Sequence, residues 1–201
     1  AGAAEDMLMA CIRANIPPTL RIQEFLLESV DRTGGKRMLM GRLYAKREGE
    51  LLRAMLRLTS PTDVNGAAYL IREGETSDEM YVYLPALNRT RRIRGGAGDG
   101  PLFGTDLSYA DIKQVQNAFS GSRPTIESHD QLDGRSTTRL ALEPTAESGS
   151  RYSRIRAWVD DKSCVAIKVE FLEGSTVRKR LTSPAKSIAK AGDYWYVGES
   201  T

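Results

Sequence analysis

Residues 50–59, with the sequence ELLRAMLRLT, alternate between apolar and polar side chains. In an extended chain Leu52 and Leu58 fall on one face, and Arg53 and Arg57 fall on the other. This two-residue period is typical of a strand in an antiparallel sheet with one buried and one solvent-facing side. The segment therefore predicts a strand with an apolar face.

Further strands are predicted on both sides of this segment, most of them separated by turns that contain glycine, aspartate or asparagine. They cover residues 20–31, 36–46, 67–72, 80–84, 89–94, 137–143, 152–160, 164–172, 175–183 and 194–197. In the segment 164–172 we expect Val165, Ile167, Val169 and Phe171 on one face, with Lys168 and Glu170 on the other. The result is about ten antiparallel strands.

Helical patterns are few. One helix is predicted at Ala3–Ala14, ended by the prolines at 17 and 18, and another at Ser108–Asn117. Residues 95–104 read as a glycine-rich loop, and the polar stretch 120–130 reads as a linker. Two helices cannot cover ten flat strands, but a curved sheet can wrap around them. We therefore expect a mainly β single domain over residues 1–201, a curved antiparallel half-barrel closed by a helical lid; a closed barrel or a sandwich is the alternative.

Composition excludes several classes of protein. The chain has 201 residues, with 40% hydrophobic and 27% charged side chains, which suits one folded domain and argues against disorder. The 29 basic residues exceed the 26 acidic ones by a margin smaller than a dedicated nucleic-acid binder usually carries. Apolar runs are much shorter than the roughly 20 residues that span a bilayer, so no transmembrane helix is expected.

The first residue and the two cysteines are informative about the cellular compartment of the protein. The chain begins with Ala1 rather than methionine, so we expect either a protein from which a signal peptide has been removed or a trimmed sequence. Cys11 and Cys164 form no CxxC pair, so a zinc finger or thioredoxin-type motif is not expected. Two alternatives remain open for them: a disulfide in an oxidising compartment, or two buried free thiols.

Candidates for chemistry are weak. The one histidine, His129, lies in the predicted linker without a nucleophile nearby in the sequence. Asp160 and Asp161 are expected to be solvated in a hairpin turn. The glycine-rich loop at 95–104 lacks the spacing of a phosphate-binding loop. We expect no catalysis, no metal ion and no cofactor.

The densest basic cluster comprises Arg89, Arg91, Arg92 and Arg94. In a strand these arginines would either protect a sheet edge by charge or dock on an acidic partner or anionic lipid headgroups. The cluster is the candidate partner-binding site.

Several motifs occur in one order along the chain. They are LRLTSP at residues 56–61, GAAYL at 66–70, MYVYLPAL at 80–87, RRI at 91–93, FGTDLSYADI at 103–112 and VAIKVEF at 165–171. On these residues the chain resembles the LolA-like outer-membrane lipoprotein-sorting proteins of the LolA/LolB superfamily. Members of that family usually continue with further strands after the region of Trp195, so we expect an end that is either trimmed or disordered here.

The resemblance implies a periplasmic protein that is not an enzyme. It implies a hydrophobic cavity that holds the acyl chains of a lipoprotein, a lipid or another amphiphile for transfer towards the outer membrane. The alternative is a periplasmic adaptor for a membrane transporter of the resistance-nodulation-division type. The expected ligand-binding residues are Leu52, Leu56, Leu58, Val82, Leu84, Val165, Ile167, Val169 and Phe171, with Phe103 and Tyr109 on the lid.

Overall fold

A computed structural model describes six segments of the chain. They are residues 2–15, 21–30, 33–77, 79–93, 124–144 and 152–197. The predicted second helix, the glycine-rich loop, Arg94 and the lid residues Phe103 and Tyr109 lie outside the described residues. No helix in these segments is long and apolar enough to cross a membrane.

Helix α1 covers Ala3–Ala14, as predicted. Glu5 and Asp6 occupy its first turn, where carboxylates are favoured by the helix dipole. The Glu5 carboxylate accepts a hydrogen bond from the backbone N–H of Gly2 at 2.9 Å, which caps the helix. Asn15 forms the C-terminal cap.

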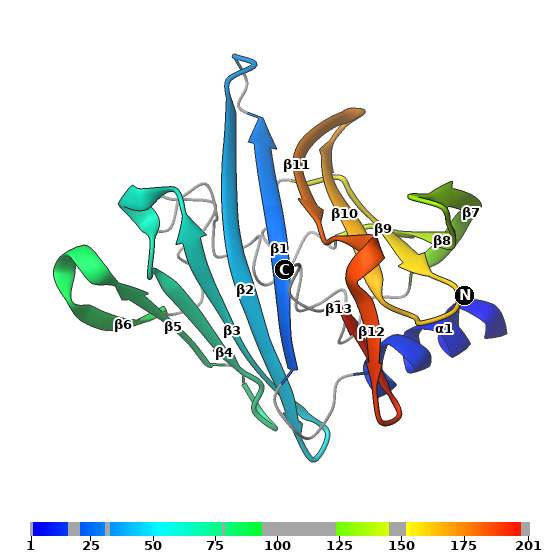
Figure 1. Ribbon diagram of the computed structural model, residues 1–201, viewed down its shortest axis with the longest axis horizontal. Helices are drawn as coiled ribbons and strands as arrows, with labels where there is room; N and C mark the ends of the chain where they lie inside the picture. The colour runs from blue at the N-terminus through cyan, green and yellow to red at the C-terminus, as the bar shows by residue number, and fades with distance from the viewer. Residues whose placement is uncertain are drawn as a thin grey trace.

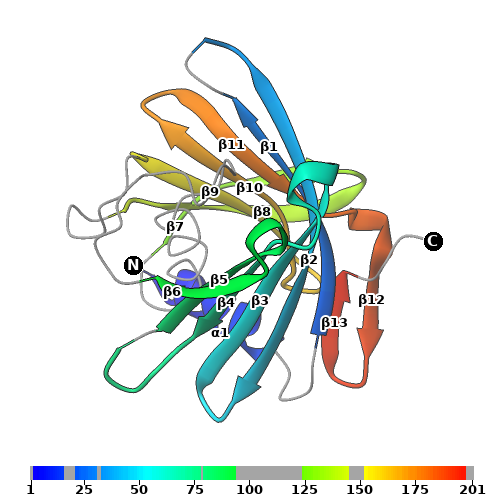
Figure 2. The same ribbon diagram turned by 90° about the vertical axis from the view of Figure 1, so that its left-hand side faces the viewer.

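Eleven strands form one antiparallel sheet (Figure 1). They are β1 Arg21–Val30, β2 Lys36–Glu48, β3 Leu51–Ser60, β4 Ala68–Arg72, β5 Glu79–Leu84, β6 Arg89–Ile93, β7 Thr125–Leu132, β8 Arg135–Leu142, β9 Arg154–Asp160, β10 Ala166–Glu173 and β11 Thr176–Thr182. Their order is β6-β5-β4-β3-β2-β1-β11-β10-β9-β8-β7, so β1 pairs with β11 and joins two meanders. The sheet curls without closing, with β6 and β7 as its end strands (Figure 2). The predicted half-barrel is confirmed.

A separate hairpin consists of β12 (Ile188–Ala191) and β13 (Tyr194–Val197). It lies beside β1 in both ribbon views. Short 3-10 turns occupy Thr62–Val64, Pro85–Leu87 and Ala185–Ser187.

The sheet has two distinct faces. We call the inner face the one that carries Leu58, Val82 and Leu140, whose side chains are buried in the core. The outer face is the opposite one and carries exposed side chains such as Met38 and Met40. Cross-strand pairs keep each face continuous from strand to strand because paired residues point to the same side.

A β-bulge in β10 corrects one sequence prediction. Ala166 pairs with Val159 and Lys168 pairs with Trp158, so Ile167 is an extra residue in the ladder. In a regular strand, the residues before and after a given position share a face of the sheet. When the residue between them is an extra one, they lie on opposite faces instead. Val165 and Ile167 therefore do not share a face with Val169 and Phe171, contrary to the strict alternation expected from the sequence.

Two strands were not expected. The segment Thr125–Leu132, predicted as part of a linker, is β7, and Ile188–Ala191 is β12. The strand β7 has only two large apolar side chains, Ile126 and Leu132, and its burial alternates weakly. The periodic signal on which strand prediction depends is therefore missing.

Candidate apolar binding site

Among the described residues, the inner face of β1–β6 carries the largest apolar cluster. Leu58, Tyr69 and Val82 are at most 1% exposed, and Phe25 and Leu27 extend the cluster onto β1. The predicted residues Leu52, Leu56 and Leu84 pack against it as half-buried neighbours. The structure thus brings together every ligand-binding residue predicted between positions 52 and 84.

An apolar pocket lies between α1 and the inner face of β8–β10. Ten side chains line it, and all are apolar: Met9, Ile12, Leu140, Leu142, Ile155, Ala157, Val159, Ala166, Val169 and Phe171. The cavity volume is about 30 Å³, close to the share of one water molecule. Val169 and Phe171 were predicted as lining residues and belong to this pocket.

The other two predicted residues of this region lie elsewhere. Val165 and Ile167 pack with Ala185, and Trp195 of the β12–β13 hairpin is their half-buried neighbour. The bulge at Ile167 is the cause, because it separates this cluster from the pocket. The pocket residues on β8 and β9 were not predicted, although the alternation in residues 138–142 and 155–159 carries the signal.

Three covalent and polar links hold the C-terminal end of α1 over the pocket. Cys11 forms a disulfide with Cys164, which settles the alternative left open by the sequence. The Asn15 side-chain amide donates a hydrogen bond to the carbonyl of Ser163, and its Oδ1 accepts one from the backbone N–H of Trp195 at 3.0 Å. These contacts attach the helix to the β9–β10 turn and to the hairpin.

The N-terminal end of α1 is attached more weakly. The Glu5 carboxylate accepts a hydrogen bond of 3.4 Å from the backbone N–H of Ile126. Its own backbone N–H and that of Ile126 lower the pKa of Glu5. Met9 and Ile12 cover the pocket, and Met9 lies between the Glu5 contact and the disulfide at Cys11.

Residues with the usual chemistry of catalysis have structural partners. The His129 ring Nδ1 lies 3.2 Å from the Thr138 hydroxyl, at the exposed end strand β7. Asp160 is 2% exposed and accepts hydrogen bonds from the Ser163 backbone N–H and hydroxyl, at 2.9 and 2.6 Å. The prediction that Asp160 is solvated is therefore wrong, because it closes the β9–β10 turn from inside. In the segments that the structure describes, no cluster of His, Cys, Asp and Glu suits a metal ion.

The arginine cluster divides between the two faces of the sheet. Arg89 pairs with Leu84 and Arg91 with Val82, which places both on the inner-face side of β6. Arg92 pairs with Tyr81 on the outer face and forms an ion pair with Glu79 at 3.2 Å.

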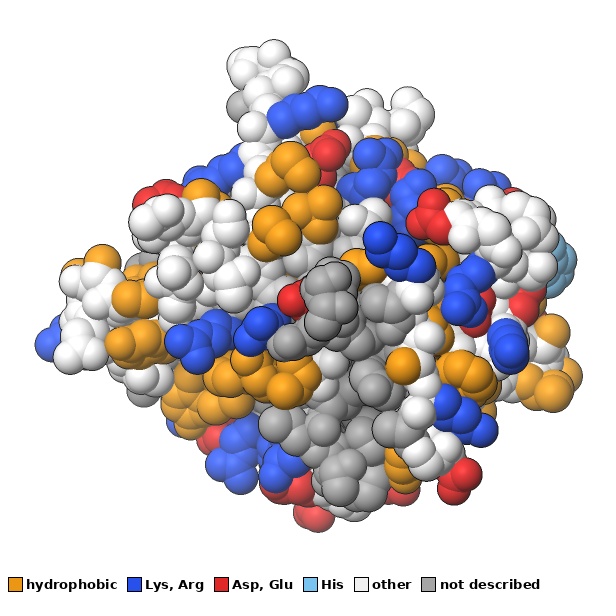
Figure 3. Space-filling model, viewed as in Figure 1, with side chains coloured by type: hydrophobic (Ala, Val, Ile, Leu, Met, Phe, Trp, Pro, Cys, Tyr) orange, Lys and Arg blue, Asp and Glu red, His pale blue; other side chains and the backbone are white. Residues whose placement is uncertain are grey.

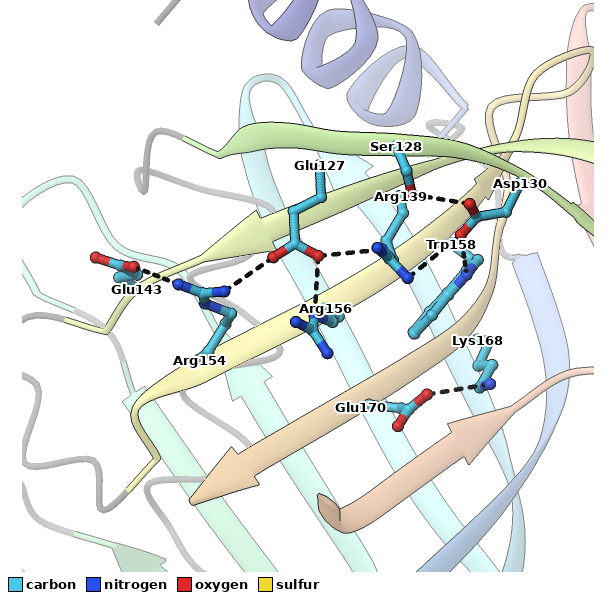
Figure 4. A network of polar contacts seen from close by, with 10 residues as sticks. All are labelled: Glu127, Ser128, Asp130, Arg139, Glu143, Arg154, Arg156, Trp158, Lys168 and Glu170. Carbon is cyan, nitrogen blue, oxygen red and sulfur yellow. Dashed lines mark hydrogen bonds and ion pairs between the residues drawn. The ribbon is translucent and has the colours of Figure 1, made fainter. Parts of the chain in front are cut away.

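The outer face of β7–β10 carries an ion-pair network that the sequence did not reveal (Figure 4). Glu127 is its centre and contacts Arg139 at 3.1 Å, Arg154 at 3.1 Å and Arg156 at 2.8 Å. The side chain of Glu127 is 16% exposed, so the three arginines enclose it. Four carboxylates balance four cations within the network, since Asp130, Glu143 and Glu170 accompany Arg139, Arg154, Arg156 and Lys168.

Trp158 lies in the same network. Lys168 Nζ lies 4.4 Å from the ring centroid, and the Arg139 guanidinium lies 5.8 Å from it. Its indole N–H donates to Asp130 at 3.0 Å. The Ser128 hydroxyl, this indole and Arg139 together lower the pKa of Asp130. Each charge here has a partner within the fold, so the network is a stabilising surface rather than a ligand site.

A family model described as "Uncharacterized protein" matches residues 51–201. No curated protein matches the sequence. A DUF1329 family protein from Desulfovibrio piger has a similar structure, with a TM-score of 0.66 and 23% identity over 96% of this chain and 82% of its own.

Two further structures are similar. A domain provisionally described as an outer membrane lipoprotein-sorting protein, from Vibrio parahaemolyticus, has a TM-score of 0.63 and 23% identity over 95% of this chain and 81% of its own. A conserved protein from Thermus thermophilus has a TM-score of 0.58 and 13% identity over 90% of this chain and 84% of its own. These likenesses establish the fold, and they confirm the resemblance to LolA-like proteins at that level.

Proposed function

The chain belongs to the family whose model matches residues 51–201. We propose that it carries the acyl chains of a lipoprotein, a lipid or another amphiphile through the periplasm towards the outer membrane. The observation that carries this proposal is the pocket beneath α1, because all ten of its lining side chains are apolar. Such a lining favours hydrocarbon over polar ligands.

The energetics of transport explain why a carrier is needed. Each methylene removed from water contributes about 0.8 kcal/mol, so a sixteen-carbon chain represents on the order of 12 kcal/mol. A free acyl chain therefore leaves a membrane very slowly. A carrier must compensate most of this cost without exceeding it, since a tighter site would retain its cargo.

Loading requires the pocket to widen. A cavity of about 30 Å³ is far too small for an acyl chain. The disulfide at Cys11 and the contacts of Asn15 fix one end of α1, whereas Glu5 holds the other end by one long hydrogen bond. We expect the N-terminal end of α1 to lift away from β7, which would move Met9 off the pocket.

A periplasmic location and a role without catalysis belong to this proposal. The Cys11–Cys164 disulfide supports an oxidising compartment, and the bacterial periplasm is one. The partners of His129 and Asp160 are structural, which supports a binding role that needs neither cofactor nor metal.

The second candidate is an adaptor for a transporter of the resistance-nodulation-division type. The side chain of Arg92 is 53% exposed on the end strand β6, where an acidic partner could reach it. Reversing the charge with Arg92→Glu should then abolish retention of the transporter in a pull-down and leave lipid binding intact. Unchanged retention would eliminate this role for β6.

Solvent extraction and mass spectrometry of protein purified without detergent test the carrier directly. We expect a stoichiometric amphiphile in the extract. An empty protein that also fails to bind a fluorescent fatty acid would refute the carrier.

Displacement of that fluorescent fatty acid tests the pocket itself. Val169→Trp would fill the space beneath α1, and we expect at least about tenfold weaker binding. Val30→Trp is the matched control, because Val30 is also half-buried but lies on β1, opposite Lys36 and away from the pocket. Equal affinity of the two folded variants would mean that cargo binds elsewhere.

A further inference from the structure

A row of apolar side chains crosses the outer face of the first five strands. The strand registers align it residue by residue, one side chain from each of β1 to β5. Its members are Ile22, Tyr44, Met55, Leu70 and Tyr81. At about 4.8 Å between strands, the row is roughly 19 Å long.

The row is accessible. Ile22 is 37% exposed and Leu70 is 38% exposed, and the three side chains between and beyond them are half-buried. Met38 and Met40, further along the same face of β2, are 52% and 51% exposed. The described outer face therefore presents a group of isoleucine, leucine, methionine and tyrosine side chains. Isolated exposed apolar side chains are normal on a protein surface, but a group of them is not.

Basic side chains flank the row on both sides. On one side of the row, Arg42 and Arg57 lie opposite each other on neighbouring strands. On the other side, Lys46, Arg53 and Arg72 lie opposite one another on β2, β3 and β4. Arg92 follows Tyr81 at the β6 end of the row. In Figure 3, Lys and Arg side chains lie among hydrophobic ones on the part of the surface formed by β2–β4.

Carboxylates compensate only part of this charge. Against the six basic residues, three acidic ones lie in these rows or next to them: Glu24, Glu48 and Glu79. The Glu48 carboxylate forms ion pairs with both Lys46 and Arg53, and the Glu79 carboxylate forms one with Arg92. Arg57 and Arg72 are exposed and have no acidic partner among the described residues.

The other half of the outer face is different. There Glu127 is enclosed by three arginines, and Glu170 contacts Lys168 at 3.0 Å and Arg180 at 3.5 Å. The charges named on the outer face of β7–β11 are thus joined in ion pairs, whereas the outer face of β1–β6 is basic and partly apolar. The excess positive charge and the exposed apolar area coincide on the same half.

We propose that the outer face of β1–β6 docks on an anionic membrane surface. Tyrosine is amphipathic and suits the level of the lipid headgroups, where its ring contacts acyl chains and its hydroxyl stays hydrated. Arg57 and Arg72 would contact headgroup phosphates while their stems lie along the apolar row. The proposal goes beyond cargo binding, because this face lies on the opposite side of the sheet from the pocket.

Co-sedimentation with lipid vesicles tests the proposal. We expect the protein to bind vesicles of phosphatidylglycerol and phosphatidylcholine mixed, to bind pure phosphatidylcholine much less, and to dissociate as salt rises. The double variant Arg57→Glu, Arg72→Glu should bind the anionic vesicles at least about tenfold more weakly. Leu70→Ser should weaken binding without changing its dependence on salt.

The matched control reverses two charges elsewhere. Lys162 and Lys186 are exposed outside the strands of this face, so Lys162→Glu, Lys186→Glu changes the net charge equally. Equal losses in the two double variants, or no binding to anionic vesicles at low salt, would overturn the proposal. Binding to an acidic protein but not to anionic vesicles would also overturn it.

The fatty-acid displacement assay separates this proposal from the carrier function. The double variant Arg57→Glu, Arg72→Glu should keep the affinity of the wild-type protein for the fluorescent fatty acid. A protein that binds vesicles but no fatty acid would refute the carrier alone, and the reverse result would refute the docking surface alone.

Discussion

The ring of Phe25 lies against Gly41, its partner across β1 and β2, so closely that a β-carbon at residue 41 would meet ring atom Cζ at 2.7 Å. The same β-carbon would also meet the carbonyl oxygen of Arg57 on β3. The register of β2 and β3 shifts between Met40 and Gly41, which brings that carbonyl close. Glycine is therefore required where three strands meet.

We expect Gly41→Ala to destabilise the protein by about 1–3 kcal/mol, because the backbone carbonyl cannot move aside as a side chain could. Urea denaturation measures the loss as a lower midpoint. Phe25→Leu should cost less in the Gly41→Ala protein than in the wild type, since one of the two contacts is then relieved. An unchanged midpoint for Gly41→Ala would show that the strands separate without cost.

The disulfide should contribute strongly to stability. Cys11 and Cys164 are 153 residues apart, and closing a loop of that length contributes up to about 5 kcal/mol in the chain-entropy model. Cys11→Ser, Cys164→Ser should lower the denaturation midpoint by a corresponding amount. Reductant should lower the wild-type midpoint to that of the variant and leave the variant unaffected; equal midpoints in oxidising buffer would contradict the expectation.

Removing the centre of the ion-pair network should cost more than removing its edge. Glu127→Gln leaves Arg139 and Arg156 facing a neutral side chain at a half-buried site, and we expect a loss of about 1–3 kcal/mol. Glu143→Gln is the matched control: it also contacts Arg154, but its side chain is 72% exposed, so we expect a loss of less than about 1 kcal/mol. Chemical denaturation of both variants compares them, and equal losses would exclude a special role for Glu127.

Stability should fall in acid through Asp130. Its pKa is lowered from the ordinary 3.8 in the folded protein, chiefly by the Ser128 hydroxyl. As pH falls, Asp130 therefore binds its proton in the unfolded state before it does so in the folded state. The contribution of ionised Asp130 to the free energy of unfolding is complete above the ordinary pKa, and it is lost as pH falls through the lower pKa of the folded state. Asp130→Asn should show a smaller loss of melting temperature than wild type between about pH 5 and about pH 2.5. Parallel curves would contradict this.

The strands with simple alternation were predictable. In β3, Leu52 and Leu58 face the core and Arg57 faces solvent, so the two-residue period is visible in the sequence. Helix α1 was also predictable in its full extent, because acidic residues begin it and prolines follow it. These elements need only local information.

The pocket and the network depend on register, which the sequence does not encode locally. Ile167 looks like one more apolar residue in an alternating strand, and only the pairing of Lys168 with Trp158 identifies it as a bulge. Glu127 meets Arg154 and Arg156 only after β7, β8 and β9 are aligned. Long-range pairing of this kind cannot be deduced from spacing along the chain.

Within the described residues, the open sheet of eleven strands ends at β6 and β7, and an end strand can pair with a strand of another molecule. At β6, antiparallel pairing of two copies centred on Arg91 would set that arginine against itself, and like charges would oppose the growth of an intermolecular sheet. At β7, the carboxylate of Glu5 already occupies the backbone N–H of Ile126. These two features oppose polymerisation of the half-barrel through β6 and β7.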